Sequence, residues 1–108
     1  MSSEKSYQTM KAALTQIGRE YRNSKRRMDL SEIEHIVSTN RRQYNRDAEF
    51  VTYIDRMLKD CNEQTRFIIR NEYLNNNDPE WYKPYYSQSA FYRRKKQAVE
   101  QFGQTLKY

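Results

Sequence analysis

Apolar residues recur at helical spacing along most of the chain, and this pattern predicts a series of amphipathic helices. The first helix is expected to run from a cap at Ser2 or Ser3 to about Arg22. Its apolar positions repeat at steps of three and four residues: Tyr7, Met10, Leu14, Ile17 and Tyr21. Gly18, inside this helix, favours close packing. The stripe can pack on the rest of the domain or on the same helix of a second copy, which leaves a homodimer open.

The pattern predicts three further helices before residue 75. Ser31-Glu32-Ile33-Glu34 is a capping box that opens the second helix, with Leu30 as a staple. Asn62 is expected to cap the fourth helix, which ends near Leu74. Residues 23–27 and 40–46 are basic and polar, and are interpreted as connectors. The apolar positions of the helices are Ile33, Ile36 and Val37; then, over residues 47–60, Phe50, Tyr53, Ile54, Met57 and Leu58; then Phe67, Ile68, Tyr73 and Leu74.

Ser87 is expected to cap the last helix. Phe91, Ala98, Phe102 and Leu106 lie on one stripe of this helix, whereas Arg93, Arg94, Lys96 and Gln97 turn away from it. Before it, three asparagines and Asp78-Pro79 end the fourth helix and predict a short helix over residues 79–83. Most of the nearby aromatic residues are expected to wedge that segment against the last helix: Trp81, Tyr82, Tyr85 and Tyr86.

Composition supports an ordered helical protein. The chain has 108 residues, of which 14% are aromatic, with two Gly and two Pro, so helices are favoured over a sheet with many turns. We predict an all-α fold of four to five helices, with an N-terminal helical extension (residues 1–46) and a C-terminal helix-turn-helix domain (residues 47–108), since two core helices, a turn and a basic helix are the layout of that motif. The start lacks the apolar region of a secretory signal and no apolar run is long enough for a membrane span, so a cytoplasmic protein is expected.

Charge indicates a polyanionic partner. The net charge is +6, and an acidic middle over residues 49–80 separates two basic ends. Catalytic constellations are missing from the sequence. Cys61 is the sole cysteine and is interpreted as a buried thiol, and His35 is the sole histidine and is interpreted as an exposed helix residue. We therefore expect no enzyme, no cofactor and no metal site.

The C-terminal half resembles the ArpU/RinA-type phage late-gene transcriptional regulators and related small mycoplasmal proteins, whose C-terminal part looks like sigma-70 region 4. The matching residues are Ile68-Ile69-Arg70-Asn71-Glu72-Tyr73-Leu74, Trp81, and the run from Tyr85 to Phe102. The resemblance implies a helix-turn-helix whose recognition helix is the last one. It also implies that Ser87, Gln88 and Ser89 stand at the start of that helix, with Arg93, Arg94 and Lys96 facing DNA. The N-terminal half is outside the resemblance.

Double-stranded DNA is therefore the expected partner, and transcription regulation the expected function. Arg93 and Arg94 are candidates for base or phosphate contact, and Lys95 and Lys96 for phosphate contact. Lys25, Arg26 and Arg27 are candidate secondary phosphate contacts. The alternative is an adaptor that binds RNA polymerase or another protein through the aromatic patch around Trp81 and Tyr85. Binding of RNA, including stacking of unpaired bases on the aromatics, is a third reading.

Overall fold

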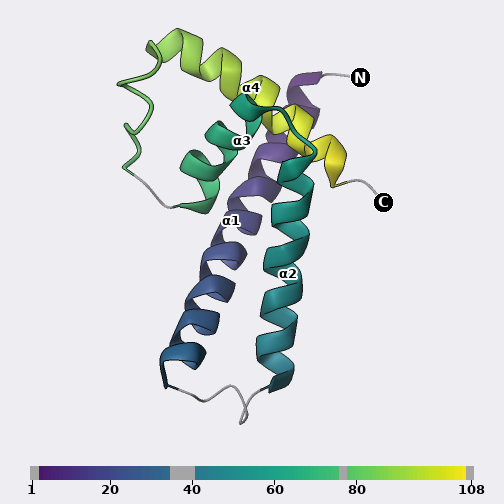
Figure 1. Cartoon of the computed structure of the whole chain (residues 1–108). Coiled ribbons are helices and arrows are strands. Elements are labelled where there is room, and N and C mark those ends of the chain that lie inside the picture. Colours follow the sequence, from purple (N-terminus) through teal and green to yellow (C-terminus); the bar gives the residue numbers. More distant parts are fainter. Residues whose placement is uncertain (1–2, 35–40, 76–77, 107–108) are drawn as a thin grey trace.

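The computed structural model describes residues 3–34, 41–75 and 78–106, and over these residues the chain is helical with no strand. Four α-helices and one π-helix follow one another along the chain (Figure 1): α1 (Ser3–Glu34), α2 (Arg41–Lys59), α3 (Glu63–Ile69), the π-helix η2 (Arg70–Leu74) and α4 (Gln88–Thr105). The predicted all-α class is confirmed. The division at residue 46 stays a prediction.

Helices α1 and α2 form a long antiparallel hairpin, and the other elements gather at one end of it (Figure 1). The chain turns sharply after α2 into α3 and η2, which pack on α1 and α4. Helix α4 crosses that end of the hairpin close to the start of α1. The opposite end of the hairpin extends away, so the molecule is elongated, with principal extents of 48 × 34 × 21 Å.

A single hydrophobic core joins all the helices. Its fully buried side chains come from α1, α2, α3 and α4: Leu14, Ile54, Leu58, Ile68, Ile69, Val99 and Phe102. The predicted stripes supply most of the core. Positions at their edges, such as Met10, Ile17, Phe50 and Phe67, are half-buried. Helical periodicity thus identified the packing faces correctly.

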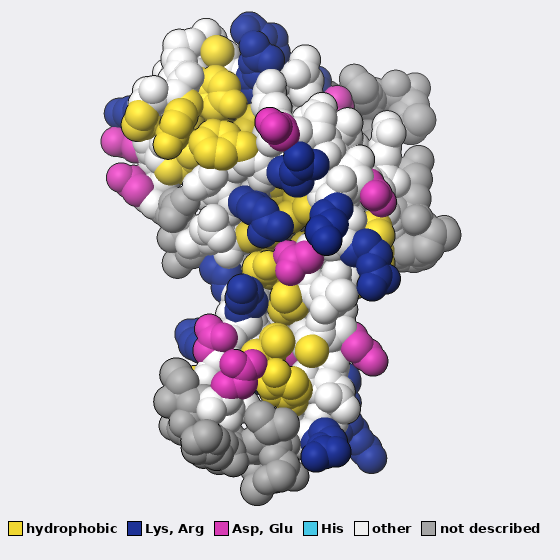
Figure 2. Space-filling view, in the orientation of Figure 1, with side chains coloured by type: hydrophobic (Ala, Val, Ile, Leu, Met, Phe, Trp, Pro, Cys, Tyr) yellow, Lys and Arg dark blue, Asp and Glu magenta, His cyan; other side chains and the backbone are white. Residues whose placement is uncertain are grey.

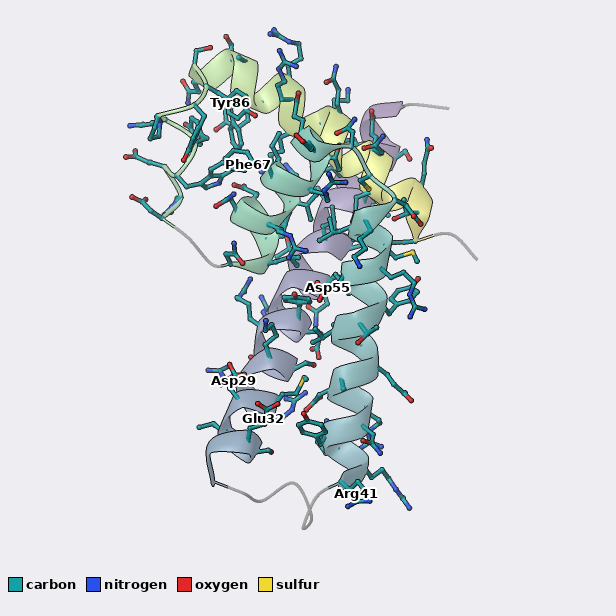
Figure 3. All side chains as sticks on the ribbon, in the orientation of Figure 1. Asp29, Glu32, Arg41, Asp55, Phe67 and Tyr86 are labelled. Atoms are coloured by element: carbon teal, nitrogen blue, oxygen red, sulfur yellow. The ribbon has the colours of Figure 1, made fainter. Side chains whose placement is uncertain are left out.

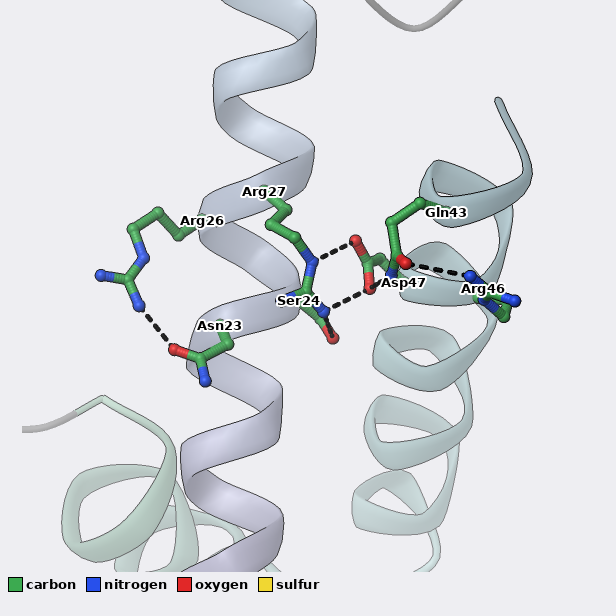
Figure 4. Close-up of polar contacts among 7 residues, drawn as sticks. All are labelled: Asn23, Ser24, Arg26, Arg27, Gln43, Arg46 and Asp47. Carbon is green, nitrogen blue, oxygen red and sulfur yellow. Dashed lines mark hydrogen bonds and ion pairs between the residues drawn. The ribbon is translucent and has the colours of Figure 1, made fainter. Parts of the chain in front are cut away.

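The connector predicted over residues 23–27 is wrong, because α1 continues through it without a break. Ser24 is buried within the hairpin, and the guanidinium of Arg27 makes a two-pronged contact with Asp47 on α2, with distances of 2.7 and 2.9 Å (Figure 4). Asp47 also accepts a bond from Gln43. The carboxylate of the neighbouring helix therefore offsets the repulsion that suggested a loop.

The boundaries of the second and third helices are also corrected. Ser31 lies inside α1, so it does not begin a separate helix, and α2 already begins at Arg41. The hydroxyl of Tyr44 on α2 donates to Glu32 on α1 at 2.8 Å, which ties this end of the hairpin together. The predicted apolar positions Ile36 and Val37, and His35, lie outside the described residues. Ile33 lies in α1, but its side chain is not described.

The ion pair between Asp47 and Arg27 should make the free energy of unfolding depend on pH. The Arg27 guanidinium lowers the pKa of this carboxyl below its ordinary value of 3.8. The stabilisation is therefore fully present above the ordinary pKa and is lost as the pH falls through the lowered value. We expect Asp47→Asn to lower the free energy of unfolding by about 1 kcal/mol at neutral pH, a modest value because Arg27 is half-exposed. Urea titrations across the acid range should show the two proteins converging; a constant difference would contradict the pairing.

Both predicted caps at the start of the later helices are confirmed. The side chain of Asn62 accepts the amide of Thr65 at 2.8 Å, and the hydroxyl of Ser87 accepts the amide of Ala90 at 3.2 Å. The short helix predicted over residues 79–83 is instead a series of turns. Amides in this segment bond to the carbonyl three residues earlier, as in Trp81 to Asp78 at 2.9 Å; Pro84 has no N–H to donate, and the turns continue to Tyr85, whose amide bonds to the Tyr82 carbonyl at 2.8 Å.

Candidate nucleic-acid interface

The outward face of α4 is polar and basic. Because Phe91, Ala98 and Phe102 are buried, helical periodicity places Arg93 and Gln97 on the opposite side, and both are exposed. Arg93 makes no ion pair with any described residue. Arg94 stands at one edge of this face and donates to Gln64 of α3 at 3.0 Å. Lys96 stands at the other edge, with its ammonium 5.7 Å from the ring centre of Tyr7 on α1.

Short polar side chains stand at the start of α4. Ser87, Gln88 and Ser89 are all exposed, as the sequence predicts for residues that meet a ligand. The Ser87 hydroxyl already accepts the Ala90 amide, so its role here is to fix where the helix begins. Ser89 lies one helical turn before Arg93 and extends the outward face. Of the predicted residues of α4, Ser89, Arg93, Arg94 and Lys96 therefore lie on or beside the outward face, whereas Ser87 and Gln88 are exposed at the helix start and Lys95 turns inward.

Lys95 does not belong to the outward face. Its ammonium donates to Glu72 of η2 at 2.7 Å, and its side chain is only 13% exposed. The same carboxylate accepts the indole N–H of Trp81 at 2.8 Å. Glu72 therefore ties α4 to the aromatic segment before it. The expectation that Lys95 contacts phosphate is corrected, because this cation is already neutralised inside the protein.

The aromatic residues before α4 form a supporting wedge, as predicted for most of them. Tyr82 stacks on Phe91 with ring centres 4.0 Å apart, and Trp81 meets Phe91 edge-on at 5.5 Å. Figure 3 shows Phe67 and Tyr86 lying between α3 and the start of α4. Tyr85 remains 62% exposed and Tyr92 54% exposed. Figure 2 shows the resulting hydrophobic patch over this end of the molecule.

The predicted secondary phosphate contacts, Lys25, Arg26 and Arg27, do not all remain available. Lys25 and Arg26 are exposed, whereas Arg27 is held by Asp47. Lys25 and Arg26 instead lie with Arg22 and Arg70 around one cavity. Sequence reasoning missed Arg22 and Arg70 because they come from distant parts of the chain; the spacing of Arg22 and Arg26 on one helix face was the only available signal.

Further features of the structure are the sole cysteine, the acidic groups and an apolar cavity. Cys61 is buried, as predicted, and burial raises the pKa of its thiol. Among the described residues, no group of three or more His, Cys, Asp or Glu is arranged to hold a metal ion, and no helix is long and apolar enough to cross a membrane. A cavity of about 550 Å³ between α1, α2 and the end of α4 has an apolar lining.

No protein-family model, curated protein or solved structure matches this chain. The assignment of function therefore depends on the residues themselves. The helix-turn-helix also stays a prediction. The turn between α2 and α3 is short, but η2 ends at Leu74 and α4 begins only at Gln88, a longer connection than the three or four residues typical of that motif.

Proposed function

We propose that the chain is a DNA-binding transcriptional regulator of the cytoplasm that uses α4 as its recognition helix, in a variant helix-turn-helix with a long connection. The observation that carries the proposal is the outward face of α4. It places Ser89, Arg93 and Gln97 in a row on a helix that α3 and the aromatic wedge hold from behind. Side chains of this kind read base edges in the major groove.

The edges of the same face suit the phosphate backbone. Arg94 and Lys96 flank Arg93 on either side, so each is positioned to meet a strand bordering the groove. The contact of Arg94 with Gln64 is an exposed hydrogen bond between two flexible side chains. Such a bond is readily exchanged for a charge-assisted bond to phosphate. Glu100, on the same side of α4 but further along, marks where a nucleic acid would leave the helix.

The proposal is tested with duplex DNA that has been selected from genomic fragments for binding to the protein. This DNA is titrated against the protein at several salt concentrations. Replacing Arg93 and Arg94 together by Gln should weaken binding roughly tenfold or more, and should flatten the salt slope by about 0.9 for each lost phosphate contact. Circular dichroism checks that the helices are retained. The charge-matched control is Arg41→Gln with Arg42→Gln, at the far end of the hairpin, where Figure 3 labels Arg41. Equal affinity of the α4 variant and the control would refute the assignment.

A protein partner is the second candidate, and the exposed rings of Tyr85 and Tyr92 favour it. RNA polymerase, or another protein with an acidic surface, would dock on this patch. A complex that survives nuclease and is lost on Tyr85→Ala, while duplex binding is unchanged, would support this candidate over DNA. Titration with single-stranded RNA tests the third hypothesis, in which the protein binds RNA and unpaired bases stack on these rings.

A further inference from the structure

Two cavities lie next to each other along α1, and Arg22 lines both. The first, about 450 Å³, lies between α1 and η2 and is lined by Lys25, Arg26 and Arg70 as well as Arg22. The second, about 310 Å³, is lined by Lys11, Thr15, Tyr73 and Lys95 among others. Arg22, whose guanidinium donates to the Tyr73 carbonyl oxygen, stands between the two cavities, and we name the pair of cavities the basic groove.

The first cavity carries a strong excess of positive charge. Four cations line it, namely Arg22, Lys25, Arg26 and Arg70, against the single carboxylate of Asp29. Arg22 donates to the carbonyl oxygen of Tyr73, and Arg26 donates to the amide oxygen of Asn23; both acceptors are neutral and leave the charge uncompensated. Arg70 lies 3.7 Å from Asp55, a long and half-exposed ion pair. These side chains therefore keep positive charge that is not neutralised within the protein and that can attract an anion.

The second cavity lies between Arg22 and α4, which lines it with Lys95. Glu72 and Lys95 neutralise each other there, which leaves Lys11 and Arg22 as its net cations. Lys11 lies 5.4 Å from the ring centre of Tyr7, and Lys96 of α4 lies 5.7 Å from the same ring. Tyr73, which also lines this cavity, has a buried hydroxyl with no hydrogen-bond partner among the described residues. The basic groove therefore begins beside the edge of the α4 face.

Helix geometry gives the basic groove a length that suits a strand of nucleic acid. Lys11, Thr15, Arg22 and Arg26 follow at intervals of four, seven and four residues, so they lie along one side of α1. The helix rise places Lys11 about 22 Å from Arg26 along the axis. That distance equals the rise of roughly six base pairs of B-DNA, measured along the duplex axis at roughly 3.4 Å each. A small anion would occupy only part of the groove.

We propose that the basic groove binds the sugar-phosphate backbone of the nucleic acid that α4 contacts. The inference rests on the proposed function and extends it, since it assigns a binding role to the N-terminal helix. Phosphates enter along Lys11 and Arg22 and end at the cavity of Lys25, Arg26 and Arg70. Such backbone contacts carry no sequence information; they fix the register in which α4 meets the bases.

The test compares three double variants in duplex titrations at several salt concentrations. The groove variant is Lys25→Gln with Arg26→Gln, chosen because both side chains are exposed, so we expect the helices to be retained, which circular dichroism checks. It should lose roughly tenfold in affinity and flatten the salt slope by about two units. The α4 variant is Arg93→Gln with Arg94→Gln, and the charge-matched control is Arg41→Gln with Arg42→Gln, which should leave the slope unchanged. Calorimetric titration of the unmodified protein with inorganic pyrophosphate separates a free phosphate compound from the nucleic-acid backbone.

Each outcome decides between the two proposals. A flattened slope for both the groove variant and the α4 variant supports both. A groove variant that behaves like the control overturns the groove and leaves α4 as the interface. A loss confined to the groove variant supports the groove and overturns the assignment of α4. Binding of pyrophosphate without binding of any duplex overturns the assignment of the groove to nucleic acid.

Discussion

Replacing Gly18 by Ala should destabilise the protein by about 3 kcal/mol, at the upper end of what overpacking a well-filled interior usually costs. The same change in an exposed helix normally stabilises by about 1 kcal/mol, because Ala has the higher helix propensity. Here a Cβ atom would collide with the backbone carbonyl of Tyr73, whose carbon would be 3.0 Å away. A backbone group cannot rotate aside, so α1 and η2 would have to separate. Urea unfolding of the variant measures the loss.

Gly103→Ala is the matched control for this prediction. A Cβ atom there would also meet close neighbours, but these are the side-chain atoms of Met10. The flexible thioether of Met10 lies at the edge of the core and can change rotamer, so we expect a change within about 1 kcal/mol of the unmodified protein. If Gly18→Ala proved as stable as Gly103→Ala, the close approach of α1 to η2 would be wrong, and the basic groove between them would have a different shape.

The sequence was sufficient to predict the buried faces but not the continuity of α1. Leu14, Ile54 and Phe102 were recognisable because burial repeats with the period of the helix. Residues 23–27 resembled a loop because their charges repel when considered alone. The partner that cancels this repulsion, Asp47, lies on α2, and only the folded hairpin brings it to Arg27. Local pattern therefore failed where a tertiary contact decided the structure.

In the candidate interface, too, the sequence predicted some placements, whereas others depend on tertiary contacts. Arg93 and Arg94 were predicted correctly as exposed, since their position follows from the apolar stripe of α4. Lys95 lies next to them in sequence but is taken up by Glu72. The placement of Glu72 depends on η2, whose wide turn is marked by the bond from the Asn75 amide to the Arg70 carbonyl at 2.8 Å. A π-helix has no clear sequence signature, so neither this pair nor the basic groove beside it was predictable.

Replacing Glu72 should have the second large effect on the free energy of unfolding. Its two carboxylate oxygens hold the Trp81 indole and the Lys95 ammonium, and the carboxylate side chain is 20% exposed. Glu72→Ala removes both acceptors and leaves Lys95 half-buried without a counter-charge. Loss of one partner of a buried pair typically costs 3–5 kcal/mol; because this pair keeps some access to water, we expect about 2–3 kcal/mol. Chemical unfolding provides the measurement.

Two further variants separate the two bonds of Glu72. Glu72→Gln retains an acceptor for the indole but not the charge, so it should fall between the unmodified protein and Glu72→Ala. Lys95→Met keeps the apolar stem that packs near Phe91, and combining it with Glu72→Ala should recover part of the loss, since the uncompensated cation is gone. Trp81 is the only tryptophan, so its fluorescence reports directly on the wedge. A red-shifted emission is expected for Glu72→Ala and not for Lys95→Met. If the losses in free energy of unfolding added strictly in the double variant, Glu72 would not couple α4 to the aromatic segment. The support proposed for the outward face of α4 would then have to come from the Tyr82–Phe91 stack alone.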